Sequence, residues 1–203
     1  FSVPHRLQEF QSAMKASFLA IAVACALSTS AVAVEPASDP NAAEAKTIVM
    51  EFFTSLKGEL AGAIEAEGPV SAIGVCKDRA PAIARELSEK FGWDVGRTAL
   101  KLRNPALNAP DDWERQVLVR FEARKAAGED VKTMAYSEVV DTGGGERYRF
   151  MKAIPTADLC LACHGETINP DIAAAVDEAY PEDQARGFKA GDIRGAFTLS
   201  KPL

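Results

Sequence analysis

Histidine is nearly absent from this sequence of 203 residues, which contains only His5 and His164. Basic clusters of the kind that follow a nucleic-acid backbone are also absent, because the 23 lysines and arginines are scattered among 29 acidic residues, for a net charge of -6. A surface of this kind does not track phosphates, so we expect no nucleic-acid partner. The length suits one well-buried core and is short for two domains, and no internal repeat is visible.

Long apolar runs are confined to the N-terminal region. Residues 14–33 begin with Met14-Lys15, continue as an apolar stretch and end in Ala31-Val32-Ala33, the small-x-small pattern of a signal-peptidase site. We therefore interpret residues 14–33 as a cleaved signal peptide and expect an exported, periplasmic protein. A retained membrane anchor is less well supported, because the run is short and lacks a basic stop-transfer flank.

The remaining boundaries follow from this interpretation. Residues 1–13 have no signal character and are interpreted as an upstream mis-start, residues 34–40 as a polar leader and residues 41–203 as a single domain. A lipoprotein attached through Cys25 is less well supported, because the apolar run continues past that cysteine. Export would leave three cysteines, an odd number for an oxidising compartment unless they have another role.

The predicted domain mixes helices and strands. Apolar residues recur at helical spacing over residues 41–67 and again from Pro69 to Leu87, where Cys76 lies on the apolar face and Pro81 predicts a kink or a restart. We further predict a short strand within a turn-rich segment at 93–110, a helix at 111–128 opened by an aspartate cap, a hairpin of 132–140 and 147–154 around DTGGGE, a helix at 172–179 and a final strand at 193–203.

The sequence CLACH at 160–164 is the attachment motif of c-type haem. In that motif Cys160 and Cys163 bond to the two vinyl groups, and His164 becomes the proximal iron ligand. Three other interpretations compete: a Cys160–Cys163 disulfide, a Cys₃His zinc site that includes Cys76, and a chance occurrence of the pattern in an exported protein. A disulfide lacks a thioredoxin-like context, and adjacent Cys163 and His164 seldom reach one tetrahedral metal. One covalently attached haem is therefore the expected cofactor.

The ligand on the other face of the iron is left open by the residues themselves. The candidates are Cys76, one of the methionines Met50, Met134 and Met151, or no ligand at all. Cys76 could equally be a small buried hydrophobe. A thiolate would lower the reduction potential because its negative charge favours ferric iron, whereas a methionine would raise it.

Four ordered motifs carry a family resemblance: VCKDRAPAIA at 75–84, GRTALKLRNPALNAPDDWE at 96–114, CLACHG at 160–165 and GFKAGDIRGAFTLSKPL at 187–203. Together they resemble the Tll0287-like family of single-haem c-type cytochromes with a PAS-like domain, long catalogued as a domain of unknown function. The resemblance implies an α+β fold with a PAS-like antiparallel sheet packed with long N-terminal helices. It also implies that Cys76 is the distal iron ligand.

Basic and aromatic residues near these motifs receive provisional roles. Arg97, Lys101 and Arg103 form a local basic cluster in an acidic protein, and we hypothesise that they bind the haem propionates. A structural role is favoured for Arg194. Core or haem-wall positions are expected for the aromatic residues Trp93, Trp113 and Phe150.

The expected function is low-potential one-electron transfer with a periplasmic redox partner. The alternative is a haem-based redox or gas sensor that binds nitric oxide or carbon monoxide and acts through a partner; fold analogy alone does not establish it. We do not expect an enzyme such as a peroxidase, because no distal histidine is available as an acid–base group.

Overall fold

The structure is a computed structural model, and it describes residues 39–203, which belong to one compact unit. The predicted upstream segment 1–13, the predicted signal peptide 14–33 and most of the predicted leader 34–40 lie outside the described residues. Pro40, assigned to that leader, is the first residue of the first helix. Among residues 39–203, no helix combines the length and apolar character needed to cross a membrane.

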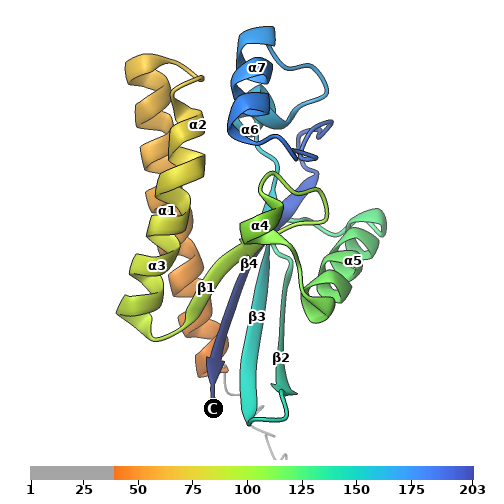
Figure 1. The fold of residues 1–203 in the computed structure, drawn as a ribbon. Coiled ribbons are helices and arrows are strands. Elements are labelled where there is room, and N and C mark those ends of the chain that lie inside the picture. Colours follow the sequence, from red (N-terminus) through yellow and green to blue (C-terminus); the bar gives the residue numbers. More distant parts are fainter. Residues whose placement is uncertain (1–38) are drawn as a thin grey trace, which may run out of the picture. The chain divides into compact units, whose positions relative to one another are not determined.

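A four-stranded antiparallel sheet forms the centre of the fold (Figure 1). Its strands are β1 (Asp94–Thr98), β2 (Ala135–Asp141), β3 (Glu146–Pro155) and β4 (Ile193–Pro202), in the order β1-β4-β3-β2. The glycine-rich turn between β2 and β3 contains Gly143 and Gly145 at positive φ, which a residue with a Cβ rarely adopts. The predicted hairpin and final strand are confirmed, as is the α+β, PAS-like fold class.

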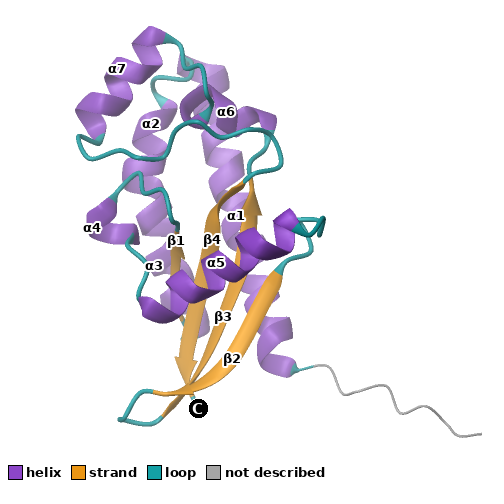
Figure 2. Cartoon of the chain, turned by 90° about the vertical axis from the view of Figure 1, so that its right-hand side faces the viewer, coloured by secondary structure: helices purple, strands orange, loops and turns teal. Residues whose placement is uncertain are grey.

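The first face of the sheet is covered by α1 (Pro40–Glu67) and α3 (Ala80–Phe91), which lie behind the sheet in Figure 2. Asp39 caps α1 by accepting a hydrogen bond from the Asn41 amide. The apolar residues of α1 recur at helical spacing, so they form one face of the helix, and this face packs on the sheet. The core at this face contains Ile48, Phe52, Ile83, Leu87, Trp93, Phe150, Phe197 and Leu199. The core positions expected for Trp93 and Phe150 are confirmed by their burial.

The second face of the sheet is covered by α5 (Asp112–Ala126), which lies in front of it in Figure 2. The predicted aspartate cap is confirmed as a full capping box, in which Asp111 accepts from the Glu114 amide and Glu114 accepts from the Asp111 amide. Met134 and Met151 are both 0% exposed in the core beneath this helix. Trp113 packs at the edge of the same core and is half-buried.

The predicted second helix is divided into three parts. Pro69 lies in the turn that follows α1, and α2 (Ala72–Gly74) leads into η1, a π-helical segment (Val75–Arg79), which is followed by α3. Pro81 has no amide hydrogen to donate to Lys77, which disfavours a continuous α-helix, and the Ala80 amide donates to Val75 instead. The predicted restart at Pro81 is confirmed, but its form, a π turn that carries Cys76, was not predicted.

Three short helices complete the fold near one end of the sheet. The segment between β1 and α5 contains α4 (Pro105–Asn108), a helical turn absent from the sequence prediction. The predicted helix at 172–179 is confirmed as α7 (Pro170–Ala179), and α6 (Asp158–His164) precedes it. Both α6 and α7 lie beyond the end of the sheet where β3 ends and β4 begins (Figures 1 and 2).

The close approach of β4 to the end of β1 predicts one stability effect. A methyl group at Gly195 would overlap the Thr98 carbonyl oxygen, which belongs to the sheet and cannot yield easily. We expect Gly195→Ala to lower the free energy of unfolding by about 1–3 kcal/mol in urea denaturation. Gly144→Ala is the control, because a methyl group there would have no atom within 4 Å, and it should change stability by less than about 0.5 kcal/mol. Equal unfolding midpoints for the two variants would contradict this packing.

Candidate haem site

The helix α6 presents the Cys-x-x-Cys-His motif on one face. Residues three and four apart lie on the same side of an α-helix, so Cys160, Cys163 and His164 face the same way. The helix ends at Gly165, whose amide donates to the Leu161 carbonyl oxygen at 2.9 Å. A Cβ at Gly165 would lie 2.6 Å from that oxygen, so the residue after the motif must be small.

The imidazole of His164 is held in a defined orientation. Its Nδ1 lies 2.7 Å from the Ala185 carbonyl oxygen, and its ring meets Phe188 edge-on with 6.2 Å between ring centroids. A carbonyl at Nδ1 favours the tautomer that leaves the Nε2 lone pair free for a metal. Burial, followed by the charges of Arg194 and Arg103, holds the pKa of His164 well below its usual value, so the ring is neutral.

Three arginines, Arg97, Arg103 and Arg194, converge on this region and are called the arginine cluster below. The charges of all three act on both His164 and Cys76. Burial lowers the pKa of each guanidinium, and for Arg194 burial and the charges of Arg103 and Arg97 lower it to about 10. Burying several like charges is costly, so the cluster favours an anionic occupant.

Arg103 is the member of the cluster with a carboxylate partner. Its Nε lies 2.9 Å from Asp183, an ion pair in which the aspartate side chain is 2% exposed. Its Nη2 lies 2.5 Å from the Cys163 carbonyl oxygen and 3.2 Å from the Ala185 carbonyl oxygen. The guanidinium of Arg103 is therefore held by a carboxylate at Nε and by two backbone carbonyls at Nη2.

Arg97 and Arg194 have no such partner. Within residues 39–203, neither guanidinium makes an ion pair with a carboxylate. The Arg97 guanidinium lies 5.6 Å from the Phe52 ring centroid, and Arg194 Nε donates a 3.3 Å hydrogen bond to His164 Nε2. Two half-buried guanidiniums without carboxylate partners fit a group that brings two carboxylates, as haem does.

Cys76 lies in the π-helical segment and is half-buried. Burial raises the pKa of its thiol, whereas the charges of Arg97, Arg103 and Arg194 act in the opposite direction and favour the thiolate. π-Helical turns occur frequently at functional sites. The thiol and the neutral imidazole of His164 are donor types that bind iron.

Apolar side chains pack beside the attachment motif. Ile73 from α2 packs with Ile172, Val176 and Tyr180, and Cys163 lies against the same group. A cavity of about 340 Å³ opens between α2 and α7 beside these residues, lined by Val70, Ile73, Gly74, Lys77, Ala175, Glu178 and Ala179. An apolar wall, thiols on one helix face and free guanidiniums together fit an apolar macrocycle with an acidic edge.

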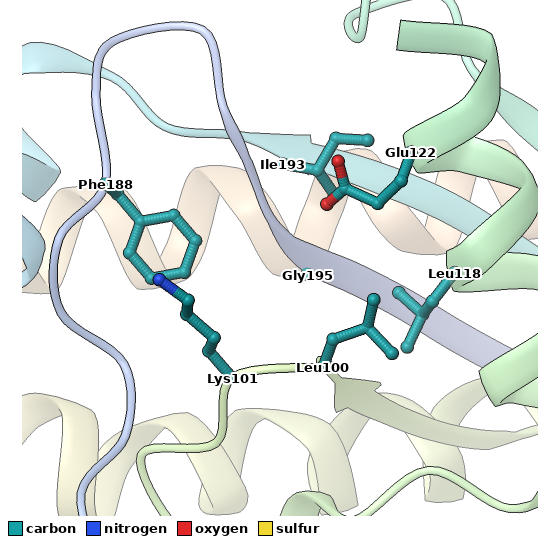
Figure 3. A pocket seen from close by; sticks show the side chains of 7 residues that line it. All are labelled: Leu100, Lys101, Leu118, Glu122, Phe188, Ile193 and Gly195. Atoms are coloured by element: carbon teal, nitrogen blue, oxygen red, sulfur yellow. The ribbon is translucent and has the colours of Figure 1, made fainter. Parts of the chain in front are cut away.

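Other predicted candidates lie elsewhere. Lys101 is exposed and reaches over the ring of Phe188, on the rim of a separate pocket of about 170 Å³ (Figure 3). Met50 is 60% exposed on α1, and the other two methionines lie in the core beneath α5. None of the methionines in the described residues packs in the apolar group beside Cys163.

The ligand set of the zinc interpretation is not gathered into one centre. In the described part of the chain, no group of three or more His, Cys, Asp or Glu side chains converges as a metal site. Cys76, Cys160 and Cys163 are free cysteines, so the Cys160–Cys163 disulfide is not formed.

Sequence reasoning missed several residues that the fold brings to the site. Arg194, which the sequence analysis assigned to a structural role, lies beside His164. Its place in the motif GDIRG was the only sequence feature that pointed to a role in the site. Asp183 and Ala185 were not singled out, because PEDQA has the composition of an ordinary surface loop. Phe188, which packs against His164, lies in the quoted motif GFKAGD but had no pattern to mark it.

Comparisons with known proteins bear on the family and the fold. The model of a family described as Tll0287-like matches residues 12–202. The crystal structure of the cyanobacterial heme-protein Tll0287 is similar with a TM-score of 0.61 and 25% identity, over 82% of this chain and 98% of that chain. No curated protein sequence matches.

The buried ion pair of Asp183 predicts a large stability effect. Asp183→Asn removes the carboxylate that compensates Arg103, and we expect the free energy of unfolding to fall by about 3–5 kcal/mol. Asp177→Asn is the matched control, because Asp177 pairs with Arg186 on the outer side of the same loop and is 67% exposed. The control should cost at most about 1 kcal/mol in chemical denaturation. Similar losses in both variants would show that the Arg103–Asp183 pair has no special role.

Proposed function

Since this chain belongs to the Tll0287-like family, we propose that it is an exported c-type haem protein with one haem attached through Cys160 and Cys163. The observation that carries the proposal is the convergence of CLACH with Arg97 and Arg194, two half-buried guanidiniums that lack carboxylate partners. The haem protein Tll0287 has the same fold over 98% of its length, which further supports a haem here. When bound, haem supplies one reversible electron at its iron.

His164 is proposed as the proximal iron ligand. The Ala185 carbonyl holds the proton on Nδ1 and turns Nε2 toward the metal, and burial keeps the ring neutral, which is the form that binds iron. Arg194 donates to that same Nε2 in this structure. It must therefore turn away when the iron is bound, and a haem carboxylate gives it an alternative partner.

Cys76 is proposed as the distal ligand. Burial raises the pKa of its thiol and the arginine charges oppose this rise, so binding to iron would complete the stabilisation of the thiolate. The methionines that compete with it lie away from the motif. Apolar residues from α2 and α7 pack beside Cys163, which favours an apolar surrounding for the haem. A neutral methionine ligand has no comparable support from the described residues.

The propionates are assigned to Arg97 and Arg194. Arg103 already pairs with Asp183, and Lys101 lies at a separate pocket, so both fit a propionate role less well than the sequence hypothesis expected. The charges then balance, because two propionates offset Arg97 and Arg194 while Asp183 offsets Arg103. The Cys76 thiolate is left as the anion bound directly to iron, and this favours the ferric state.

Low-potential electron transfer is the function that this charge balance supports best. A redox partner protein in the periplasm would exchange electrons with the haem, and no nucleic acid or stable membrane insertion is proposed. A haem-based sensor of redox state or of nitric oxide or carbon monoxide is the second candidate. It is favoured by the cavity between α2 and α7, which would give the segment around Cys76 room to move if a bound haem exchanged this ligand.

Spectra of the purified protein test the ligands. The wild type should show a low-spin ferric electron paramagnetic resonance signal with thiolate character, and Cys76→Ala should abolish that character. Met134→Leu and Met151→Leu serve as controls and should leave the spectrum unchanged. An unchanged Cys76→Ala spectrum would remove Cys76 from the iron. Carbon monoxide binding by the wild-type ferrous protein would favour the sensor, and its failure to bind would favour electron transfer.

A second experiment tests the propionate assignment. Arg97→Gln and Arg194→Gln each remove the only cation offered to one carboxylate, so we expect a lower reduction potential and weaker retention of haem in a variant lacking both attachment cysteines. Lys101→Gln removes a charge of the same sign outside the cluster and should change both quantities much less. Equal effects of all three substitutions would contradict the assignment, because they would show that any nearby positive charge acts in the same way.

A further inference from the structure

Arg103 joins the two segments that surround the imidazole. Its Nη2 lies 2.5 Å from the carbonyl oxygen of Cys163, in the last turn of α6, and 3.2 Å from the carbonyl oxygen of Ala185, in the loop after α7. Carbonyls in the last turn of a helix lack partners within it, so a cation there satisfies one of them. One guanidinium therefore connects the end of the attachment helix to the loop that faces His164.

The loop itself, residues 183–188, is fixed on both sides. The Gln184 amide donates to the Leu102 carbonyl at 2.7 Å, next to Arg103, and the Phe188 amide donates to the His164 carbonyl at 3.0 Å. Asp183 accepts from the Ala185 amide at 2.9 Å while it pairs with Arg103. The Ala185 carbonyl is thus placed by its neighbours rather than by its own conformational preference.

The proton on Nδ1 depends on which partner this atom engages. Nδ1 lies 2.7 Å from the Ala185 carbonyl oxygen and also 2.7 Å from Arg103 Nη2. An N–H can donate only to the carbonyl, and a lone pair can accept only from the guanidinium, so the two contacts require different tautomers. Arg194 donates to Nε2, which requires a lone pair there and therefore assigns the proton to Nδ1.

We propose that Arg103 is a positioning residue for His164: anchored by Asp183, it holds the Ala185 carbonyl against Nδ1 so that Nδ1 keeps its proton and Nε2 faces the iron. The role of Nε2 rests on the proposed haem function, whereas the position of the proton does not. In this arrangement Arg103 uses its donors on the carbonyls of Cys163 and Ala185 and does not bind a propionate.

The experiment compares Arg103→Ala and Arg103→Lys with Arg186→Ala in a His5→Ala background, where His164 is the only imidazole. Arg186 pairs with the same Asp183 from the outer side and does not contact His164, which makes it a matched control. The readouts are hydrogen exchange of the Nδ1 proton by ¹⁵N-histidine NMR in the reduced haem protein, and the ferric electron paramagnetic resonance spectrum.

We expect exchange about tenfold faster in Arg103→Ala, as for the loss of one hydrogen bond, together with a second ferric species. Arg103→Lys should restore part of the protection, because it keeps the charge but not the fork of donors, and Arg186→Ala should match the wild type. Slow exchange and a single ferric species in Arg103→Ala would overturn the proposal, as would equal changes in Arg186→Ala.

Two further measurements distinguish failure of the positioning role from failure of the variant to fold and from the absence of haem. If Arg103→Ala does not fold, Asp183→Asn retains the guanidinium without its anchor, and wild-type exchange in that variant would also overturn the proposal. If the wild type carries no haem, the proposed function fails. The ¹⁵N shifts of His164 in the haem-free chain then report the tautomer directly, and an identical tautomer in wild type and Arg103→Ala would exclude a positioning role.

Discussion

The gathering of three partly buried guanidiniums around one thiol and one imidazole is the constraint on which the site depends. Arg97, Arg103 and Arg194 lie close enough for their charges to act on one another, while Asp183 is the buried carboxylate that pairs with one of them. Such an arrangement is costly in an apolar surrounding unless anions complete it. The site is therefore electrostatically incomplete as protein alone, and the proposed haem is what balances it.

The rest of the fold holds this cluster in place. The two packed faces of the sheet, one under α1 and α3 and one under α5, account for most of the buried side chains and contain none of the proposed ligands. The ligands come from the segments beyond the end of the sheet and from the π turn that precedes α3. Arg97 and Arg194 reach the site from the adjacent strands β1 and β4, so the sheet sets the positions of both cations.

Local patterns predicted the elements but not how the site is shared among them. The spacing of Ile48 and Phe52, the cap at Asp111 and the glycines between β2 and β3 each act within a few residues, and each indicated its element correctly. Lys101 and Arg194 both lie over the ring of Phe188, but Arg194 also donates to His164, and this difference depends on the tertiary fold. Asp183 gave no signal either, because its burial is caused by the return of the loop onto Leu102 and His164.

The π turn has a consequence for the helix that contains it. A turn of five residues in place of four shifts the helical phase by one residue, about 100° of rotation around the axis. Ile73, before the turn, faces Val176 of α7, whereas Ile83 and Leu87, after it, face α1 and the sheet. One continuous stretch of chain thus serves two apolar cores that lie in different directions, and Cys76 lies where the phase changes. Because the residue lies between the segments that pack on these two cores, a displacement of α7 or a rotation of α3 would each shift the position of its sulfur atom.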